Sequence, residues 1–131
     1  MTVVSGIFLI LHALVHLLYA GQALRFFELR PGLAWPDGAW VFSRLLGDAA
    51  TRNLAAVSLT MAALAFLTAG LGLFFSAGWA RAVTLGAAGF SALIYLLFWD
   101  GKFQALPDQG GVGMLISLVI LAVVLILKQP L

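Results

Sequence analysis

Cysteine is absent from the 131 residues of this chain, and charged side chains account for only 9% of them. The absence of cysteine excludes disulfides, thiol redox chemistry and thiolate metal ligands. The shortage of charge is more informative, because a soluble domain usually carries about 25% charged residues. With 63% hydrophobic residues and a mean hydropathy of +1.11, the chain has too few polar groups to cover its own surface. We therefore expect lipid to be its solvent and residues 1–131 to form a single transmembrane domain.

Clusters of basic residues are also missing. The formal net charge is +2, but the seven Lys and Arg residues are scattered along the chain. Nucleic-acid surfaces gather basic side chains in one run or on one face, so nucleic acid is not an expected partner. The expected partners are the lipid bilayer and, through close helix packing, other membrane subunits or a second copy of the chain.

Four apolar runs are long enough to be considered as membrane helices. They cover about residues 3–28, 52–75, 80–99 and 111–128, and crossing a bilayer takes about 20 helical residues. The first loop holds Trp35 and Trp40, whose amphipathic rings favour the headgroup region, so it predicts a short interfacial segment. The sequence thus predicts an all-α fold, an integral membrane four-helix bundle.

The distribution of Lys and Arg predicts the orientation of this bundle. Four spans place both termini on one side of the membrane. On the side of the first and third loops lie Arg25, Arg30, Arg44, Arg52 and Lys102, against Arg81 and Lys128 on the other side. Because cytoplasmic loops carry the excess of basic residues, we expect the termini to lie outside.

Polar side chains form a stripe on the first predicted helix. At about 100° per residue, His12, His16 and Tyr19 fall on one face. An ionisable group inside a membrane is costly and normally faces protein or a water-filled cavity. The third predicted helix has a similar line, formed by Thr84, Ser91 and Tyr95. We expect the two lines to face each other, and these six residues are the candidate ligand-binding site.

The histidine pair has three interpretations. Its rings can donate structural hydrogen bonds across the bundle, or they can bind a ligand or pass protons. Histidines four residues apart on a helix can also share a metal ion, but no predicted span supplies a further carboxylate or thiolate ligand. A haem would need a histidine from a second protomer, because axial ligands approach from opposite sides. No cofactor is predicted.

The sequence contains no recognisable catalytic set. Ser5 shares the stripe with His12, but the acid that completes a catalytic triad is missing. In the third loop, Asp100 and Lys102 could pair at the mouth of the bundle or form a solvated turn. We keep these two residues as loop candidates and predict no catalytic residue.

The segments LHALVHLLYAGQAL and WDGKF and the glycine-led last helix resemble small bacterial four-helix membrane proteins. In outline the chain is also similar to DoxX-like bundles. The resemblance implies a four-helix bundle in a bacterial inner membrane, and it carries over no catalytic residue.

Two classes of function follow from these observations. In the first, the chain is a non-enzymatic membrane component or subunit that packs against partners. In the second, it binds or transports a small apolar ligand, a proton or a solute at the stripe of His12, His16 and Tyr19. An enzyme acting on lipid or quinone is a weaker third class.

Overall fold

The computed structural model describes residues 2–28, 35–99 and 111–127, and in these residues the chain forms five α-helices. They are α1 (Thr2–Ala23), α2 (Phe42–Leu46), α3 (Asp48–Phe74), α4 (Ala80–Leu97) and α5 (Gly111–Leu127). No strand occurs in this part of the chain, so the all-α prediction is confirmed there. Three helices are long and apolar enough to cross a membrane: Val3–Ala23, Asp48–Phe74 and Ala80–Leu97.

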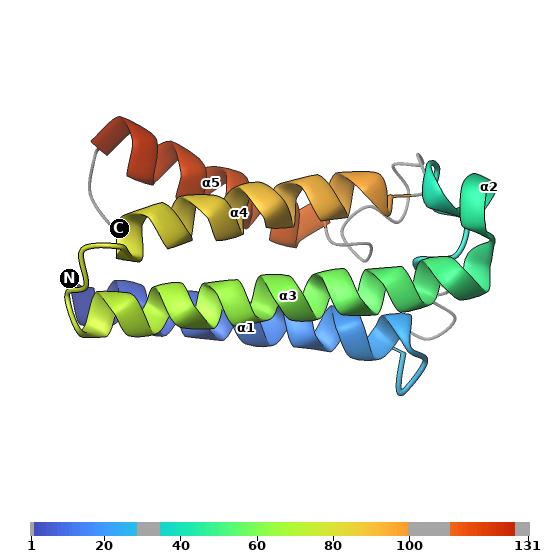
Figure 1. The fold of residues 1–131 in the computed structure, drawn as a ribbon, viewed down its shortest axis with the longest axis horizontal. Helices are drawn as coiled ribbons and strands as arrows, with labels where there is room; N and C mark the ends of the chain where they lie inside the picture. Colours follow the sequence, from blue (N-terminus) through green and yellow to red (C-terminus); the bar gives the residue numbers. More distant parts are fainter. Residues whose placement is uncertain (1, 29–34, 100–110, 128–131) are drawn as a thin grey trace.

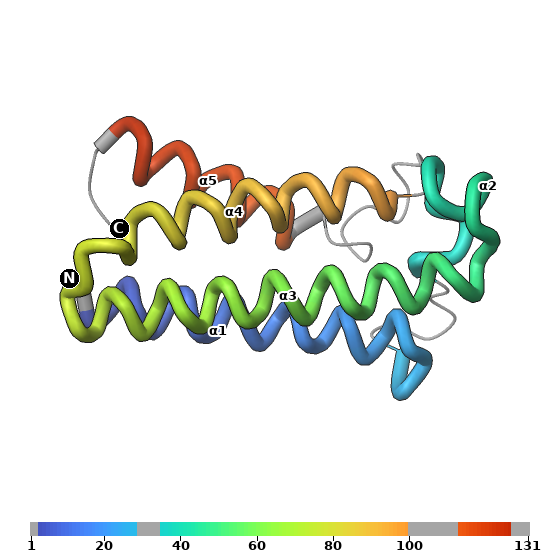
Figure 2. The backbone as a smooth tube through the Cα atoms, viewed as in Figure 1, coloured from blue at the N-terminus to red at the C-terminus, as the bar shows by residue number. Residues whose placement is uncertain are grey.

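The four longer helices lie side by side, with α2 across one end (Figure 1). α3 packs closely on α1 and also on α4, and α4 in turn packs on α5. α1 and α5 touch much less. The tube in Figure 2 shows α1 beginning and α5 ending at the end of the molecule opposite α2.

α1 ends earlier than the predicted residue 28, because Arg25 adopts a left-handed backbone with φ of 65°. The amide of Phe26 donates to the carbonyl of Gly21, and that of Arg25 donates to the carbonyl of Gln22. These two bonds define a Schellman motif, which usually has glycine at the left-handed position. The predicted end near residue 28 was therefore wrong by about one helical turn.

A second Schellman motif ends α3. Ser76 has φ of 51°, and the amide of Ala77 donates to the carbonyl of Gly72. The other end of α3 also differs from the prediction: the helix begins at Asp48 rather than near residue 52. It starts immediately after Gly47, whose φ of 81° lets the chain turn from α2 into α3.

The segment between residues 35 and 41 closes the end of the molecule that carries α2. The indole nitrogen of Trp35 donates to the carbonyl of Phe98, and that of Trp40 donates to the carbonyl of Leu96. These carbonyls at the end of α4 have no partner within their own helix. The predicted interfacial segment therefore contains a short helix, and its tryptophans also cap α4, which ends at Leu97 rather than at residue 99.

Asp37 holds the same segment to two helices. Its carboxylate accepts two hydrogen bonds of 2.6 Å from Arg52 of α3, and it lies 3.0 Å from the guanidinium of Arg25. Arg25 also donates to the carbonyl of Trp35 at 2.7 Å. One carboxylate thus joins the end of α1 to the first turns of α3.

The apolar core consists of two clusters, and polar residues lie at the boundary between them. One cluster includes Leu9, Phe66 and Ile120, and the other includes Leu59, Tyr95 and Phe98. His16 lies between the two clusters, because its ring contacts Phe66 of one and Tyr95 of the other, and Ser91 and Ser117 are also fully buried.

Candidate functional site

His16 is the centre of the buried polar group. Its side chain is fully buried, and its two ring nitrogens point at different helices. Nδ1 lies 2.9 Å from the carbonyl oxygen of His12, one turn earlier in α1. Nε2 lies 2.6 Å from the hydroxyl of Ser91 in α4. The four-residue spacing thus supplies one bond within α1, and the other bond crosses the core to α4.

Ser117 of α5 completes the group. Its hydroxyl lies 3.0 Å from the hydroxyl of Ser91 and 3.3 Å from Nε2 of His12. The four side chains of His12, Ser117, Ser91 and His16 therefore form a continuous hydrogen-bonded chain, which we call the histidine–serine chain. It joins α1, α4 and α5 in the core.

Aromatic rings enclose the two imidazoles. The ring of Phe66 from α3 lies 4.7 Å from that of His12 and 5.0 Å from that of His16, measured between centroids. Tyr95 stands 5.4 Å from His16 on the side facing α2. In these apolar surroundings, a polar group that loses its partner cannot turn to water instead.

Tyr95 and Tyr19 belong to a second, aromatic group. Their rings meet edge to face at 5.6 Å, and both also contact Trp35. Tyr95 is almost completely buried, yet its hydroxyl makes no hydrogen bond with any residue that the structure describes. Gly113 of α5 leaves room for this ring, because a Cβ there would lie 2.9 Å from Cε2 of Tyr95.

The predicted site residues are only partly brought together. His12 and His16 share one network with Ser91, and Tyr95 stacks beside it. Thr84 is separate, since its buried hydroxyl donates to the carbonyl of Ala80 within α4. The loop candidates Asp100 and Lys102 lie outside the described residues.

The two helices that carry the predicted polar lines, α1 and α4, are not direct neighbours. The main neighbour of α1 is α3, whereas α4 lies diagonally across the core. The side chain of His16 reaches across the core from α1 to α4. Nε2 of His16 lies within hydrogen-bonding distance of the hydroxyl of Ser91.

Ser117 is the member of the histidine–serine chain that the sequence analysis did not select. The sequence did contain a signal, because Ser117 is the only polar side chain in the run from Gly111 to Leu127. A lone polar residue in an apolar helix normally faces protein, and Ser117 is fully buried.

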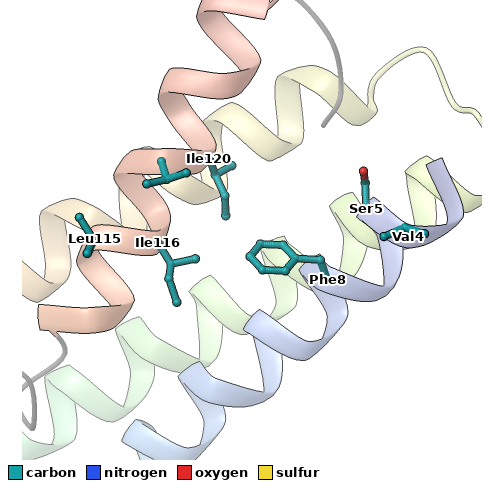
Figure 3. Close-up of a pocket in the computed structure, with 7 residues that line it drawn as sticks. Val4, Ser5, Phe8, Leu115, Ile116 and Ile120 are labelled. Carbon is teal, nitrogen blue, oxygen red and sulfur yellow. The ribbon is translucent and has the colours of Figure 1, made fainter. Parts of the chain in front are cut away.

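An apolar pocket of about 430 Å³ lies beside the histidine–serine chain, between α1 and α5. Its walls are Val4, Ser5 and Phe8 on α1 and four residues between Leu115 and Ile120 on α5, as Figure 3 shows. Ligand pockets in proteins typically measure about 300–1,000 Å³. The ring of Phe8 also stacks on His12, with centroids 6.3 Å apart and planes 12° from parallel. Phe8 therefore stands between the pocket and the first member of the chain.

The arrangement suits hydrogen bonding better than metal ligation. In residues 2–28, 35–99 and 111–127, no group of three or more His, Cys, Asp or Glu side chains could hold a metal ion. The two imidazoles lie at 89° to each other on one helix, and both Nε2 atoms are engaged with serines. That geometry does not fit a pair of axial haem ligands within one chain.

No protein-family model, curated protein or solved structure matches this chain.

Proposed function

We propose that the chain is an integral membrane four-helix bundle formed by α1, α3, α4 and α5. The observation that supports this is that polar side chains are buried and large apolar side chains are exposed, which is the reverse of the arrangement in a soluble protein. Fully or nearly buried positions hold His12, His16, Gln22, Ser91 and Ser117, while large apolar side chains cover the outer faces of all four helices. Lipid tolerates such a surface, and water does not. α5 is the shortest of the four spans, about 25 Å at 1.5 Å per residue, which suits a thin region of bilayer.

The proposed location is a bacterial inner membrane, with the termini outside and the segment 35–41 in the cytoplasm. The basic residues support this orientation, because Arg25, Arg44 and Arg52 gather at the end of the molecule that carries α2. Arg81 lies at the opposite end.

The natural absence of cysteine makes the topology directly testable. Single cysteines introduced at the exposed positions Leu45 and Gly78 would report the two ends of the molecule. We expect a membrane-impermeant thiol reagent applied to intact cells to label the Gly78→Cys protein and spare the Leu45→Cys protein. The opposite pattern would reverse the orientation, and labelling of both would contradict the membrane topology.

We propose further that the bundle is non-enzymatic and binds a small amphipathic molecule. Its apolar part would occupy the pocket between α1 and α5, and its polar head would approach His12. The observation that carries this proposal is the position of Phe8, which lines the pocket and stacks on a histidine of the buried polar chain. A purely structural hydrogen-bonded chain would not need a ligand-sized pocket beside it.

Native mass spectrometry of the gently extracted protein tests this proposal. Val119→Trp should fill the pocket, because Val119 is one of its walls. Leu118→Trp is the matched control, since Leu118 is the exposed neighbour in α5 and is not a wall. We expect a co-extracted small molecule on the wild-type and Leu118→Trp proteins, and its loss from Val119→Trp. Equal occupancy in all three proteins would contradict the site.

A role as a subunit of a larger membrane assembly is the second candidate. It is favoured by the outer face of α4, where a Cβ added at Gly86 or Gly89 would meet no atom within 4 Å. Glycines on an open helix face allow a second helix to approach closely. A stoichiometric protein partner in the same mass spectra would favour this role.

A further inference from the structure

We infer that the molecule bound in the α1/α5 pocket carries a neutral hydrogen-bond donor, of which a hydroxyl group is the simplest, and that this group donates to His12. This inference rests on the proposed binding function and adds the chemical class of the ligand. It excludes molecules whose head groups can only accept, such as ketones, esters and ethers. The direction of each hydrogen bond in the histidine–serine chain leads to this requirement.

The direction is set at His16. Its Nδ1 lies 2.9 Å from the carbonyl oxygen of His12, and a carbonyl oxygen can only accept, so Nδ1 carries the proton. No Asp or Glu occurs in α1, α4 or α5 to balance an imidazolium, so the ring is neutral. In a neutral imidazole the other nitrogen is an acceptor. The Ser91 hydroxyl therefore donates to Nε2 across the 2.6 Å contact.

The same direction continues through the two serines. A hydroxyl has one proton, and that of Ser91 is used on His16. The Ser117 hydroxyl must therefore donate to Ser91 at 3.0 Å. Its own proton is then used, so His12 must donate to Ser117 through Nε2–H at 3.3 Å.

This result leaves His12 with an acceptor at Nδ1. With its proton on Nε2, a neutral His12 presents only a lone pair there. Nδ1 makes no hydrogen bond with any residue that the structure describes, whereas the corresponding atom of His16 is bonded. A ligand head group meeting this lone pair must supply the proton.

Phe8 is the pocket wall that contacts His12, which is not itself one of the walls. Its ring is 44% exposed, lines the pocket and lies parallel to the imidazole. Rotation of an exposed side chain takes picoseconds to nanoseconds and needs no movement of the helices. The other walls are almost entirely apolar, so the expected ligand is an alcohol or phenol with a long or bulky hydrocarbon part.

Two probes of matched length separate the donor from the acceptor. Dodecanol and methyl undecyl ether have the same number of heavy atoms, but only the alcohol donates a hydrogen bond. We would measure their binding to the full-length protein in nanodiscs by native mass spectrometry. We expect dodecanol to bind about fivefold more tightly, the ratio produced by one hydrogen bond of roughly 1 kcal/mol. In His12→Phe the two affinities should become equal.

The outcomes distinguish this inference from the function on which it rests. Equal binding of both probes to the wild-type protein, or tighter binding of the ether, would overturn the donor requirement and leave the binding function standing. Binding of neither would overturn both. Nitrogen NMR of histidine-labelled wild-type protein gives a second test that does not depend on a variant. It should show His12 protonated at Nε2 and a shift of its Nδ1 signal with dodecanol alone, and a proton on Nδ1 would contradict the inference.

Discussion

Nε2 of His16 lies 2.6 Å from the hydroxyl of Ser91, although 75 residues separate them along the chain. This contact is the shortest in the histidine–serine chain, and it crosses the core diagonally from α1 to α4. Ser91 also accepts from Ser117. Helices α1, α4 and α5 are thus joined through a single hydroxyl, in a core where neither partner has access to water.

Ser91→Ala should therefore destabilise the protein. The substitution leaves the acceptor of His16 and the donor of Ser117 without partners, and each buried unsatisfied group costs about 1–3 kcal/mol. We expect the free energy of unfolding in detergent to fall by an amount in that range. Thr68→Ala is the control, because Thr68 lies on the exposed face of α3 and bonds only to the carbonyl of Leu64. Equal stability of both variants would contradict a stabilising role for the histidine–serine chain.

A close contact between α1 and α3 at Gly70 gives a second prediction. A Cβ added at Gly70 would lie 2.9 Å from the carbonyl oxygen of Gly6 and 2.8 Å from Cγ1 of Ile10. Gly70→Ala should therefore force the helices apart and cost about 1–3 kcal/mol, the usual penalty for overpacking.

Gly86→Ala is the matched control for Gly70→Ala, because a Cβ at Gly86 meets nothing within 4 Å. Alanine is the better helix former by about 1 kcal/mol, so this variant should lose no stability. Thermal unfolding of both proteins in the same detergent provides the comparison. A larger loss at Gly86 would show that the outer face of α4 is covered by another helix.

The left-handed residue at the end of α3 leads to a third prediction. Ser76 has φ of 51° and makes no side-chain hydrogen bond among the described residues. Glycine adopts this conformation without steric cost, whereas other residues pay roughly 1 kcal/mol or more. Ser76→Gly should raise the melting temperature, and Ser76→Ala should leave it nearly unchanged. A lower melting temperature for the glycine variant would contradict the backbone assignment.

The sequence predicted the polar stripe because helical periodicity places His12 and His16 on one face, and apolar surroundings require that face to point inward. It did not predict which residues would be the hydrogen-bond partners of the two histidines. The same line of residues on the third predicted helix includes Thr84, whose hydroxyl bonds within its own helix, and Ser91, which reaches His16. Helical periodicity predicts which face of a helix a residue occupies. It does not predict which residue of another helix lies at the same level in the core.

The helix ends were the least predictable part of the fold. Both Schellman motifs place a non-glycine residue, Arg25 or Ser76, in the left-handed conformation, so the usual glycine signal is missing. At Arg25 the guanidinium compensates through bonds to Trp35 and Asp37. Those partners lie 10 and 12 residues further along the chain, and local sequence patterns do not reveal such pairings.

The unpartnered hydroxyl of Tyr95 gives the final prediction. It is buried between α1, α4 and α5 and has no hydrogen-bond partner among the described residues. Tyr95→Phe keeps the ring contacts with His16 and Tyr19 and removes only the oxygen. Because a buried hydroxyl without a partner costs about 1–3 kcal/mol, we expect the free energy of unfolding to rise by about 1 kcal/mol or more. Tyr19→Phe is the matched control, since the ring of Tyr19 packs against those of Tyr95 and Trp35 in the same aromatic group. A fall in the free energy of unfolding of Tyr95→Phe would contradict this prediction and would show that the Tyr95 hydroxyl has a hydrogen-bond partner in the folded protein.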